Sequence, residues 1–251
     1  MIKIIICGIK GRMGGLIAQL AYNDTDIKLV GGTEKPGDRE YPDKLETIIE
    51  KADVVIDFTT PSLSIENLKT AAARKKAAVI GTTGFTEQQL TEIDKISREI
   101  PCVCSPNMST GVNLMFNLVS RISEKLPDYD IEIIEKHHRR KKDAPSGTAK
   151  KIADNISKTL NLSPDKSCVH GRQGTTGERP HNQIGIHAVR AGDIVGEHTI
   201  IWAGPGETLE LTHRALSRAT FAQGALKAAK FAASAAPGQY SMQDVLEQSK
   251  P

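Results

Sequence analysis

The first hundred residues alternate short apolar runs with segments of helical period. Helix signals lie between the runs, because Ser62 precedes Ile65, and Thr86 stands three residues before Gln89 in the spacing of a capping box. The apolar runs span residues 2–7, 27–31, 54–58, 78–80 and 102–104. Since they are apolar at successive positions, they favour strands of a parallel sheet that is covered on both faces. The alternation predicts a doubly wound α/β domain.

The pattern of apolar and polar residues changes at about Thr110. A long amphipathic helix is predicted from there, with its apolar stripe at Leu114, Leu118, Ile122 and Leu126. Strand-length runs follow at residues 131–134, 184–189, 197–202 and 208–212. Several of these runs alternate apolar and polar positions, which indicates a sheet with one wetter face. The second part is therefore predicted to be an α+β domain with a mixed sheet.

Two further segments complete the predicted organisation. Residues 163–183 carry glycines and prolines without an apolar period, so we expect a long loop, and long ordered loops are often functional. Residues 217–235 form an alanine-rich helix that is too apolar to stand alone, and we expect it to pack on the first domain. The chain should thus contain two domains, formed by residues 1–108 with 219–251 and by residues 109–218.

Composition narrows the class of protein. A chain of 251 residues with 39% hydrophobic and 25% charged residues can bury a substantial core, and it contains no run of the ~18 apolar residues that a membrane span needs. Its start lacks the pattern of a secretory signal, so we expect a cytoplasmic protein. The net charge of +3 is too small to argue for a nucleic-acid partner. The cysteines lack metal-site or disulfide spacing, so we expect no metal; they are Cys7, Cys102, Cys104 and Cys168.

A glycine turn follows the first predicted strand. Gly8, Gly11 and Gly14 lie between that strand and a helical pattern, which is the context of a dinucleotide-binding turn. Backbone N–H groups at such a helix start can approach a pyrophosphate, and Arg12 adds a cation beside it. The alternative is a glycine-rich helix start without a ligand.

The expected acid for the cofactor ribose comes about 20 residues later, as Glu34. Lys35 follows it and could meet a 2′-phosphate, so NADH and NADPH both stay open. Two more segments, Gly81-Thr82-Thr83-Gly84 and Ser105-Pro106-Asn107-Met108, fall after predicted strands, where ligands of open α/β sheets bind. Either could instead be an ordinary turn. The first domain is predicted to be a Rossmann-type doubly wound sheet.

A basic segment at residues 137–142 places six consecutive basic side chains after a strand. A solvated charge run or a nucleic-acid patch would be the simpler interpretations. Ser146, Gly147 and Thr148 follow it and offer hydroxyl and free N–H groups at a helix start, which suits a carboxylate. Histidine can move protons near neutral pH, and lysine among other cations can donate one. The segment therefore predicts a site for a small anionic substrate.

Several motifs together resemble one known family. They are Gly8-x-x-Gly11-Arg12-Met13-Gly14, Gly81-Thr82-Thr83-Gly84, Glu135-x-His137-His138-Arg139-x-Lys141-x-Asp143-Ala144-Pro145-Ser146-Gly147-Thr148-Ala149, Gly177-Glu178-Arg179 and Arg190-Ala191-Gly192-Asp193-Ile194-Val195-Gly196-Glu197-His198. The chain is similar along nearly its whole length to the 4-hydroxy-tetrahydrodipicolinate reductases (dihydrodipicolinate reductases) of the diaminopimelate route to lysine.

The resemblance implies that NADH or NADPH passes a hydride to a cyclic dicarboxylate. It implies His137 as general acid/base, Lys141 as a proton donor, and His138 with Gly147 and Thr148 as carboxylate ligands. The implied cofactor contacts are Gly8, Ile9, Lys10, Gly11, Arg12, Met13, Glu34, Lys35, Gly81, Thr82, Thr83, Ser105, Pro106, Asn107 and Met108. It also implies a homotetramer joined through the sheet of the second domain. The stretch between Gly31 and Ala52 is short, with room for little helix, which leaves cofactor preference open.

Two other functions compete with this reading. A dinucleotide-binding regulatory protein would use the basic segment to dock an anionic partner or nucleic acid, with binding that depends steeply on salt. A dehydrogenase acting on an aldehyde would need an activated cysteine thiolate or another base in the second domain, and no cysteine here has an obvious activating neighbour in sequence.

Overall fold

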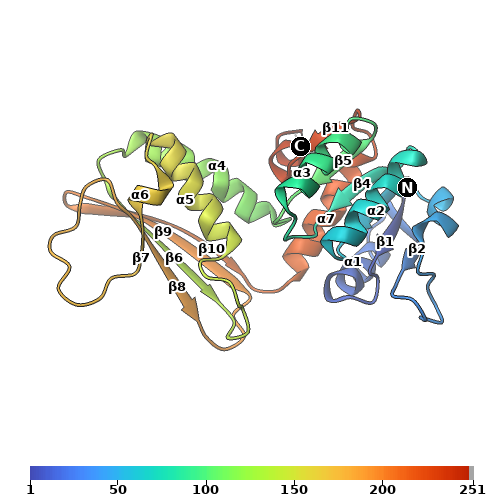
Figure 1. Cartoon of the computed structure of the whole chain (residues 1–251), viewed down its shortest axis with the longest axis horizontal. Helices are drawn as coiled ribbons and strands as arrows, with labels where there is room; N and C mark the ends of the chain where they lie inside the picture. The colour runs from blue at the N-terminus through green and yellow to red at the C-terminus, as the bar shows by residue number, and fades with distance from the viewer. Residues whose placement is uncertain (249–251) are drawn as a thin grey trace. The chain divides into compact units, whose positions relative to one another are not determined.

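The computed structural model describes residues 1–248 and divides into two compact units (Figure 1). The first unit comprises Met1–Thr110 and the chain from Arg218 onward, and the second comprises Gly111–Ser217. No helix in the described part of the chain has the length and apolar character that a membrane crossing requires.

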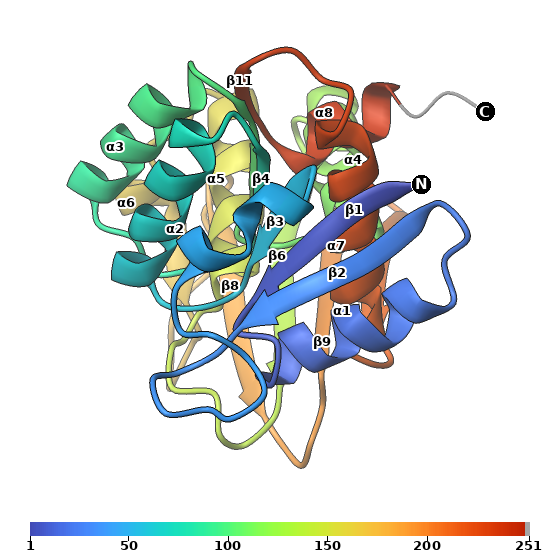
Figure 2. The same cartoon turned by 90° about the vertical axis from the view of Figure 1, so that its right-hand side faces the viewer.

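The first unit is built on a parallel sheet of six strands within the described residues, in the order β11-β5-β4-β3-β1-β2. The strands are β1 (Ile2–Cys7), β2 (Ile27–Thr33), β3 (Val54–Asp57), β4 (Ala77–Ile80), β5 (Pro101–Cys104) and β11 (Gly238–Tyr240). Helices α1 (Arg12–Tyr22) and α7 (Ala219–Ala232) cover one face, and α2 (Pro61–Ala73) and α3 (Glu87–Ser97) cover the other (Figure 2). This arrangement confirms the predicted doubly wound sheet.

Most local predictions for the first unit agree with the structure. The capping box of Thr86 and Gln89 is present, and α7 packs on α1 and the sheet as expected. Only the short 3₁₀ helices η1 (Leu45–Thr47) and η2 (Ile49–Lys51) lie between β2 and β3. The helix signal at Ser62 falls within the first turn of α2, which begins at Pro61 with Thr60 as its N-cap. Strand β11 and helix α8 (Met242–Gln248) were not predicted.

The second unit contains a mixed sheet in the order β10-β9-β6-β8-β7, as expected. Its strands are β6 (Asp130–His137), β7 (Cys168–His170), β8 (Ile184–Arg190), β9 (Gly196–Gly204) and β10 (Glu207–Ala215). Helices α4 (Thr110–Lys125) and α5 (Gly147–Thr159) pack on one face of the sheet, and Ile133 and Trp202 lie beneath them in a common apolar core. We call this the helix-side face.

Two predictions for the second unit need correction. Helix α4 buries the predicted stripe only in part. Ile122 and Leu126 pack against the core, but Leu114 is 51% exposed, and Val112, Met115 and Val119 supply the buried side chains. The helix is apolar on more than one side, so leucines four residues apart did not identify the face that meets the sheet. The predicted loop at residues 163–183 also contains α6 (Pro164–Ser167) and β7, which leaves residues 171–183 as the loop.

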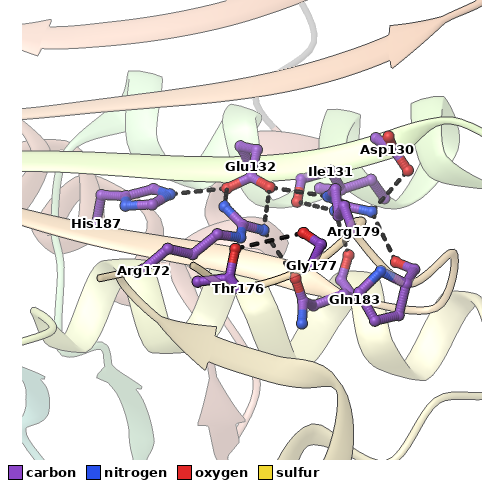
Figure 3. A network of polar contacts seen from close by, with 10 residues as sticks. Asp130, Ile131, Glu132, Arg172, Thr176, Gly177, Arg179, Gln183 and His187 are labelled. Carbon is purple, nitrogen blue, oxygen red and sulfur yellow. Dashed lines mark hydrogen bonds and ion pairs between the residues drawn. The ribbon is translucent and has the colours of Figure 1, made fainter. Parts of the chain in front are cut away.

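The carboxylate of Glu132 on β6 holds this loop (Figure 3). Arg172 donates two hydrogen bonds to it, at 2.8 and 3.1 Å, and Arg179 and His187 contact it at 3.0 and 2.7 Å. Arg179 also donates to Asp130 at 2.6 Å. Burial would raise the pKa of Glu132, but its bonds to Arg172, His187 and Arg179 outweigh this and lower the pKa to about 2. The carboxylate therefore stays charged at any physiological pH.

The contacts of Glu132 with Arg172, Arg179 and His187 predict how the loop responds to a mutation. In Glu132→Gln the bidentate bond to Arg172 is lost, so the loop should open more often and trypsin should cut the exposed Arg172–Gln173 bond about five to ten times faster. The exposed Glu210, on β10 of the same sheet, provides the control Glu210→Gln, which should be cut at the parental rate. Equal cleavage of both variants would show that Glu132 does not hold the loop.

Candidate active site

The glycine turn lies at the carboxyl end of β1, next to both β2 and β3, where the strand order of the sheet changes direction. Gly8 has a φ of +76°, which favours glycine, and its N–H donates to the Thr33 carbonyl at 2.9 Å. Gly11 is the N-cap of α1, and no side chain caps the helix there. The first N–H groups of α1 therefore remain available for an anion such as a pyrophosphate.

Gly14 lets α1 pack directly on the turn. A Cβ at this position would lie 2.1 Å from the Gly8 carbonyl oxygen and 2.8 Å from the Ile9 Cα. Both are backbone atoms, which cannot move aside as a flexible side chain can. Gly15 is the next residue, and its Cβ would meet only the Ile9 carbonyl oxygen, at an ordinary 3.8 Å.

Glu34 follows β2 directly and lies against the glycine turn. It accepts the Lys10 N–H at 2.9 Å and the Lys35 N–H at 3.1 Å. The Lys10 ammonium pairs with Asp38 at 2.7 Å and Glu40 at 3.2 Å. The structure thus brings Glu34 and Lys10 together, and the Lys10 N–H is used within the protein. Arg12 and Lys35 are exposed beside them.

Asp57 at the end of β3 organises the neighbouring loops. It is 3% exposed and accepts hydrogen bonds from the Thr59 N–H at 3.0 Å, Ser64 Oγ at 2.6 Å, Asn67 Nδ2 at 2.6 Å and Thr82 Oγ1 at 3.0 Å. Because the Thr82 hydroxyl is used here, a ligand could reach this residue only through its backbone. The adjacent Thr83 is exposed.

The segment after β5 is tightly folded. The Ser105 hydroxyl donates to the Asn107 carbonyl at 2.9 Å, and Asn107 Oδ1 accepts the Ser109 N–H at the same distance. The Met108 side chain is buried in the core of the first unit, so it cannot present itself to a ligand. Pro106 is exposed at the turn.

In the second unit the helix-side face becomes polar where β6 and β8 end. Along β6, the buried Ile131 and Ile133 are followed by Glu135 and His137 at the same alternation. His137 pairs with Arg190 on β8, and Glu135 lies opposite His198 on β9. Adjacent strands thus bring a carboxylate, histidines and a guanidinium together.

Glu135 has no exposed surface. Arg190 donates to both of its oxygens at 2.7 Å, His137 Nδ1 lies 2.5 Å from Oε2, and the Ser146 N–H donates to Oε1 at 2.9 Å. Burial raises the pKa of Glu135, but the bonds from Arg190, His137 and Ser146 outweigh it and hold the pKa below its ordinary value. Glu135 is therefore ionised at neutral pH.

Burial favours the neutral form of the histidines nearby. Burial lowers the pKa of His137, and the interaction with Glu135 offsets this only in part. Burial lowers the pKa of His198 to about 3. His198 Nε2 lies 3.1 Å from Ser146 Oγ, and the rings of His137 and His198 meet edge to face at 5.2 Å. The Nδ1 atom of His198 has no hydrogen-bond partner in the described residues.

The rest of the basic segment divides into two groups. Lys141 is 21% exposed and pairs with Asp143 at 2.9 Å, and Arg190 donates to the Asp143 carbonyl at 2.7 Å. His138 is half-buried. The other cations point to solvent, and they are Arg139, Arg140 and Lys142.

The start of α5 only partly matches the prediction. Ser146 is the N-cap, with its hydroxyl accepting the Ala149 N–H at 3.2 Å. The predicted free N–H at Ser146 is wrong, because that group donates to Glu135. Gly147 is exposed at the first helical position, and Thr148 is half-buried beside it. The N–H groups of the first turn still favour an anion.

The described residues do not favour catalysis by a cysteine thiolate or by a metal ion. Burial raises the pKa of Cys102 to about 12 and that of Cys104 to about 11, and it also raises the pKa values of Cys7 and Cys168. Such thiols are poor nucleophiles. No group of three or more His, Cys, Asp or Glu side chains suited to a metal occurs in residues 1–248. A cavity of about 910 Å³ beside Pro145 and Ala188 contains none of the predicted site residues.

Comparison with known proteins agrees with both halves of the fold. The family profile described as "Dihydrodipicolinate reductase, N-terminus" matches residues 2–108, and its C-terminus counterpart matches residues 111–246. The chain belongs to the dihydrodipicolinate reductase family. This confirms the resemblance stated from the motifs.

Relatives of this dihydrodipicolinate reductase family member match it over nearly their whole length. The 4-hydroxy-tetrahydrodipicolinate reductase of Syntrophobacter fumaroxidans is 45% identical, covering 98% of this chain and 99% of the relative. That of Geobacter sulfurreducens is 41% identical with the same coverage. A solved dihydrodipicolinate reductase from Paenisporosarcina sp. TG-14, with dipicolinate bound, has a TM-score of 0.80 and 29% identity over 96% of this chain and 97% of that one.

The sequence motifs and their spacing assign no role to Glu135, Arg190, His198 or Asp57. For Glu135 a signal existed, since a carboxylate continues the buried alternation of Ile131 and Ile133. Asp57 also ends a run of buried residues on β3. Buried acids need partners. Apart from Thr59 and His137, which are two residues away from Asp57 and Glu135, these partners lie 7 to 55 residues away in sequence, so spacing alone could not identify them.

The glycine turn yields a matched pair of variants. Gly14→Ala should lower the free energy of unfolding by about 1 to 3 kcal/mol, because its methyl group would strike backbone of the turn, and cofactor affinity should fall with it. Gly15→Ala should leave stability unchanged or raise it by up to about 1 kcal/mol, because alanine favours the helix. Denaturant unfolding and a cofactor titration measure both effects. Similar behaviour of the two variants would contradict the close packing at Gly14.

Proposed function

We propose that this chain catalyses the NADH- or NADPH-dependent reduction of 4-hydroxy-tetrahydrodipicolinate to tetrahydrodipicolinate, in the diaminopimelate route of lysine biosynthesis. The observation that carries the proposal is the group of Glu135, His137 and Arg190 beside the cationic loop and the start of α5. Membership of the reductase family, with relatives of that name at 41–45% identity, supports it.

The first unit offers a suitable seat for the cofactor. An uncapped helix start after Gly8 and Gly11 suits a pyrophosphate, and the Glu34 carboxylate suits ribose hydroxyls. Further contacts are proposed at Gly81 to Thr83 and at Ser105 to Met108, through backbone groups where side chains are buried. A nicotinamide cofactor bound there would supply the hydride.

The second unit offers groups for a dicarboxylate. Lys141 supplies a cation, and the start of α5 at Gly147 and Thr148 supplies N–H groups and the helix dipole. His138 and Ser146 complete the proposed set. The relative from Paenisporosarcina was solved with dipicolinate, a planar dicarboxylate, which supports this substrate class.

His137 is proposed as the general acid/base. Its Nδ1 faces Glu135, so Nε2 is the atom that can exchange a proton with a ligand. Lys141 is a second proton donor, and its charge offsets that of the substrate. These roles require no cysteine or metal chemistry.

We also propose a cytoplasmic homotetramer. All four cysteines are unpaired, which suits a reducing compartment. The face of the mixed sheet away from α4 and α5 carries Val189, which is 39% exposed, and such a surface suits an interface. Light scattering coupled to gel filtration should give about four times the chain mass of 27.2 kDa, and a monomer would contradict the proposal.

The central test removes the proposed proton donors. His137→Gln with Lys141→Ala should lower kcat by more than about 100-fold, because general acid–base catalysis supplies at least that factor. Cofactor binding, measured by fluorescence, should survive. Lys142 is the exposed neighbour of Lys141 and provides the control. Lys142→Ala should reduce kcat at least about tenfold less than Lys141→Ala does, because an exposed cation contributes little. A double variant that kept the full rate would refute the roles.

A competition experiment resolves the cofactor. Calorimetric titration of NADH against NADPH measures the two affinities directly. Lys35→Ala should weaken NADPH binding by about tenfold and NADH binding little, because a 2′-phosphate is the group that would use its charge. An equal loss for both cofactors would show that Lys35 does not face the 2′ position.

A further inference from the structure

We infer that Glu135 is a positioning residue that holds His137 in a single orientation and tautomer and ties it to the start of α5. The inference rests on the acid/base role proposed for His137. Glu135 itself has no exposed surface, so no substrate atom needs to reach it. Its effect on the reaction would pass through the residues that it binds.

The tautomer of His137 follows from the charge of Glu135. A carboxylate can only accept hydrogen bonds, and Arg190 already donates to both oxygens of Glu135. His137 Nδ1, 2.5 Å from Oε2, must therefore carry a hydrogen and donate it. In neutral His137 this leaves Nε2 as the unprotonated atom, ready to take up a proton that the imidazolium form can later release.

The surroundings of the ring fix its orientation as well. A Cβ on Gly196 would lie 3.1 Å from His137 Nε2, so the absence of a side chain there makes room for the ring. His198 meets the ring edge to face on the β9 side. With Glu135 holding Nδ1, the imidazole is limited on three sides. A flip of the ring would break the bond to Glu135.

The same carboxylate connects His137 to the cationic loop. It accepts the Ser146 N–H at the cap of α5, and its partner Arg190 also donates to the Asp143 carbonyl. Asp143 in turn pairs with Lys141. Loss of Glu135 would thus release the histidine, the helix start and the loop together.

Glu135 also sets the charge balance at His137. The groups facing the ring are Glu135 on β6, Arg190 on β8, Lys141 in the loop and the neutral His198 on β9. Burial and then the two cations lower the pKa of His137, and Glu135 is the group that raises it. Removing the Glu135 charge should therefore lower this pKa further. For a general acid, the fall in rate with rising pH would then begin at a lower pH.

The first test needs no variant. Solid-state ¹⁵N NMR of histidine-labelled protein, with the His137 signals assigned by their absence in His137→Gln, reports the tautomer without any turnover. We expect protonated Nδ1 and unprotonated Nε2 at neutral pH. The opposite tautomer would overturn the inference even if the proposed reaction stands.

The second test uses Glu135→Gln, which keeps the shape and removes the charge. We expect kcat to fall by about 100-fold or more, which is the scale of general acid–base catalysis itself, with cofactor affinity unchanged. The pH limb of His137 should move to lower pH, and NMR should show mixed tautomers. Glu66→Gln, at an exposed position on α2 of the first unit, is the control and should keep the parental rate and profile.

The outcomes separate the two proposals. A parental pH limb and a single parental tautomer in Glu135→Gln would overturn the positioning role. Full turnover in His137→Gln would instead refute the acid/base assignment, while the NMR result would still decide whether Glu135 holds the ring. If Glu135→Gln does not fold, the wild-type tautomer and its titration remain decisive.

Discussion

The second unit is organised by a carboxylate that has no access to water. Burying the charge of Glu135 would cost several kcal/mol unless donors surround it. The structure supplies them from the ends of β6 and β8 and from the start of α5, as His137, Arg190 and the Ser146 N–H. Because each donor belongs to a different segment, satisfying one charge also fixes the relative positions of these segments. The geometry of the candidate site is a consequence of that requirement.

In the first unit a buried carboxylate is stabilised by neutral hydrogen-bond donors. Asp57 is almost as buried as Glu135, but its partners are the hydroxyls of Ser64 and Thr82, the Asn67 amide and a backbone N–H. These donors come from the segment after β3, from α2 and from the loop after β4, at the carboxyl edge of the sheet next to the glycine turn. In both units a buried acid at the end of a parallel strand converts an apolar sheet into a defined polar edge. The two differ in that a guanidinium balances only Glu135.

The sequence was sufficient for features that depend on local pattern. Strands β1 to β5, the capping box at Thr86 and the glycine turn all follow from neighbours within a few residues, and the structure agrees with them, whereas β11 gave no such local signal. Helix α4 was misjudged because its surface is apolar on more than one side, so only packing against the sheet selects Val112 over Leu114. The motifs placed His137 and Lys141 in one segment, whereas the partners of Glu135 depend on strand pairing. Register between β6 and β8, not spacing along the chain, brings Arg190 to it.

The division of the six basic residues follows from the same constraints. The alternation of side chains along β6 places His137 on the same face as Glu135. Arg139, Arg140 and Lys142 reach solvent, where a charge costs little. Lys141 lies between these cases, since it is largely covered but paired with Asp143, whose side chain is 59% exposed. Under the proposed function a substrate carboxylate would displace Asp143, and that acid can turn into water at small cost. A cation held by an exposed partner is therefore both preorganised and exchangeable, which a fully buried pair such as Glu135 and Arg190 could not be.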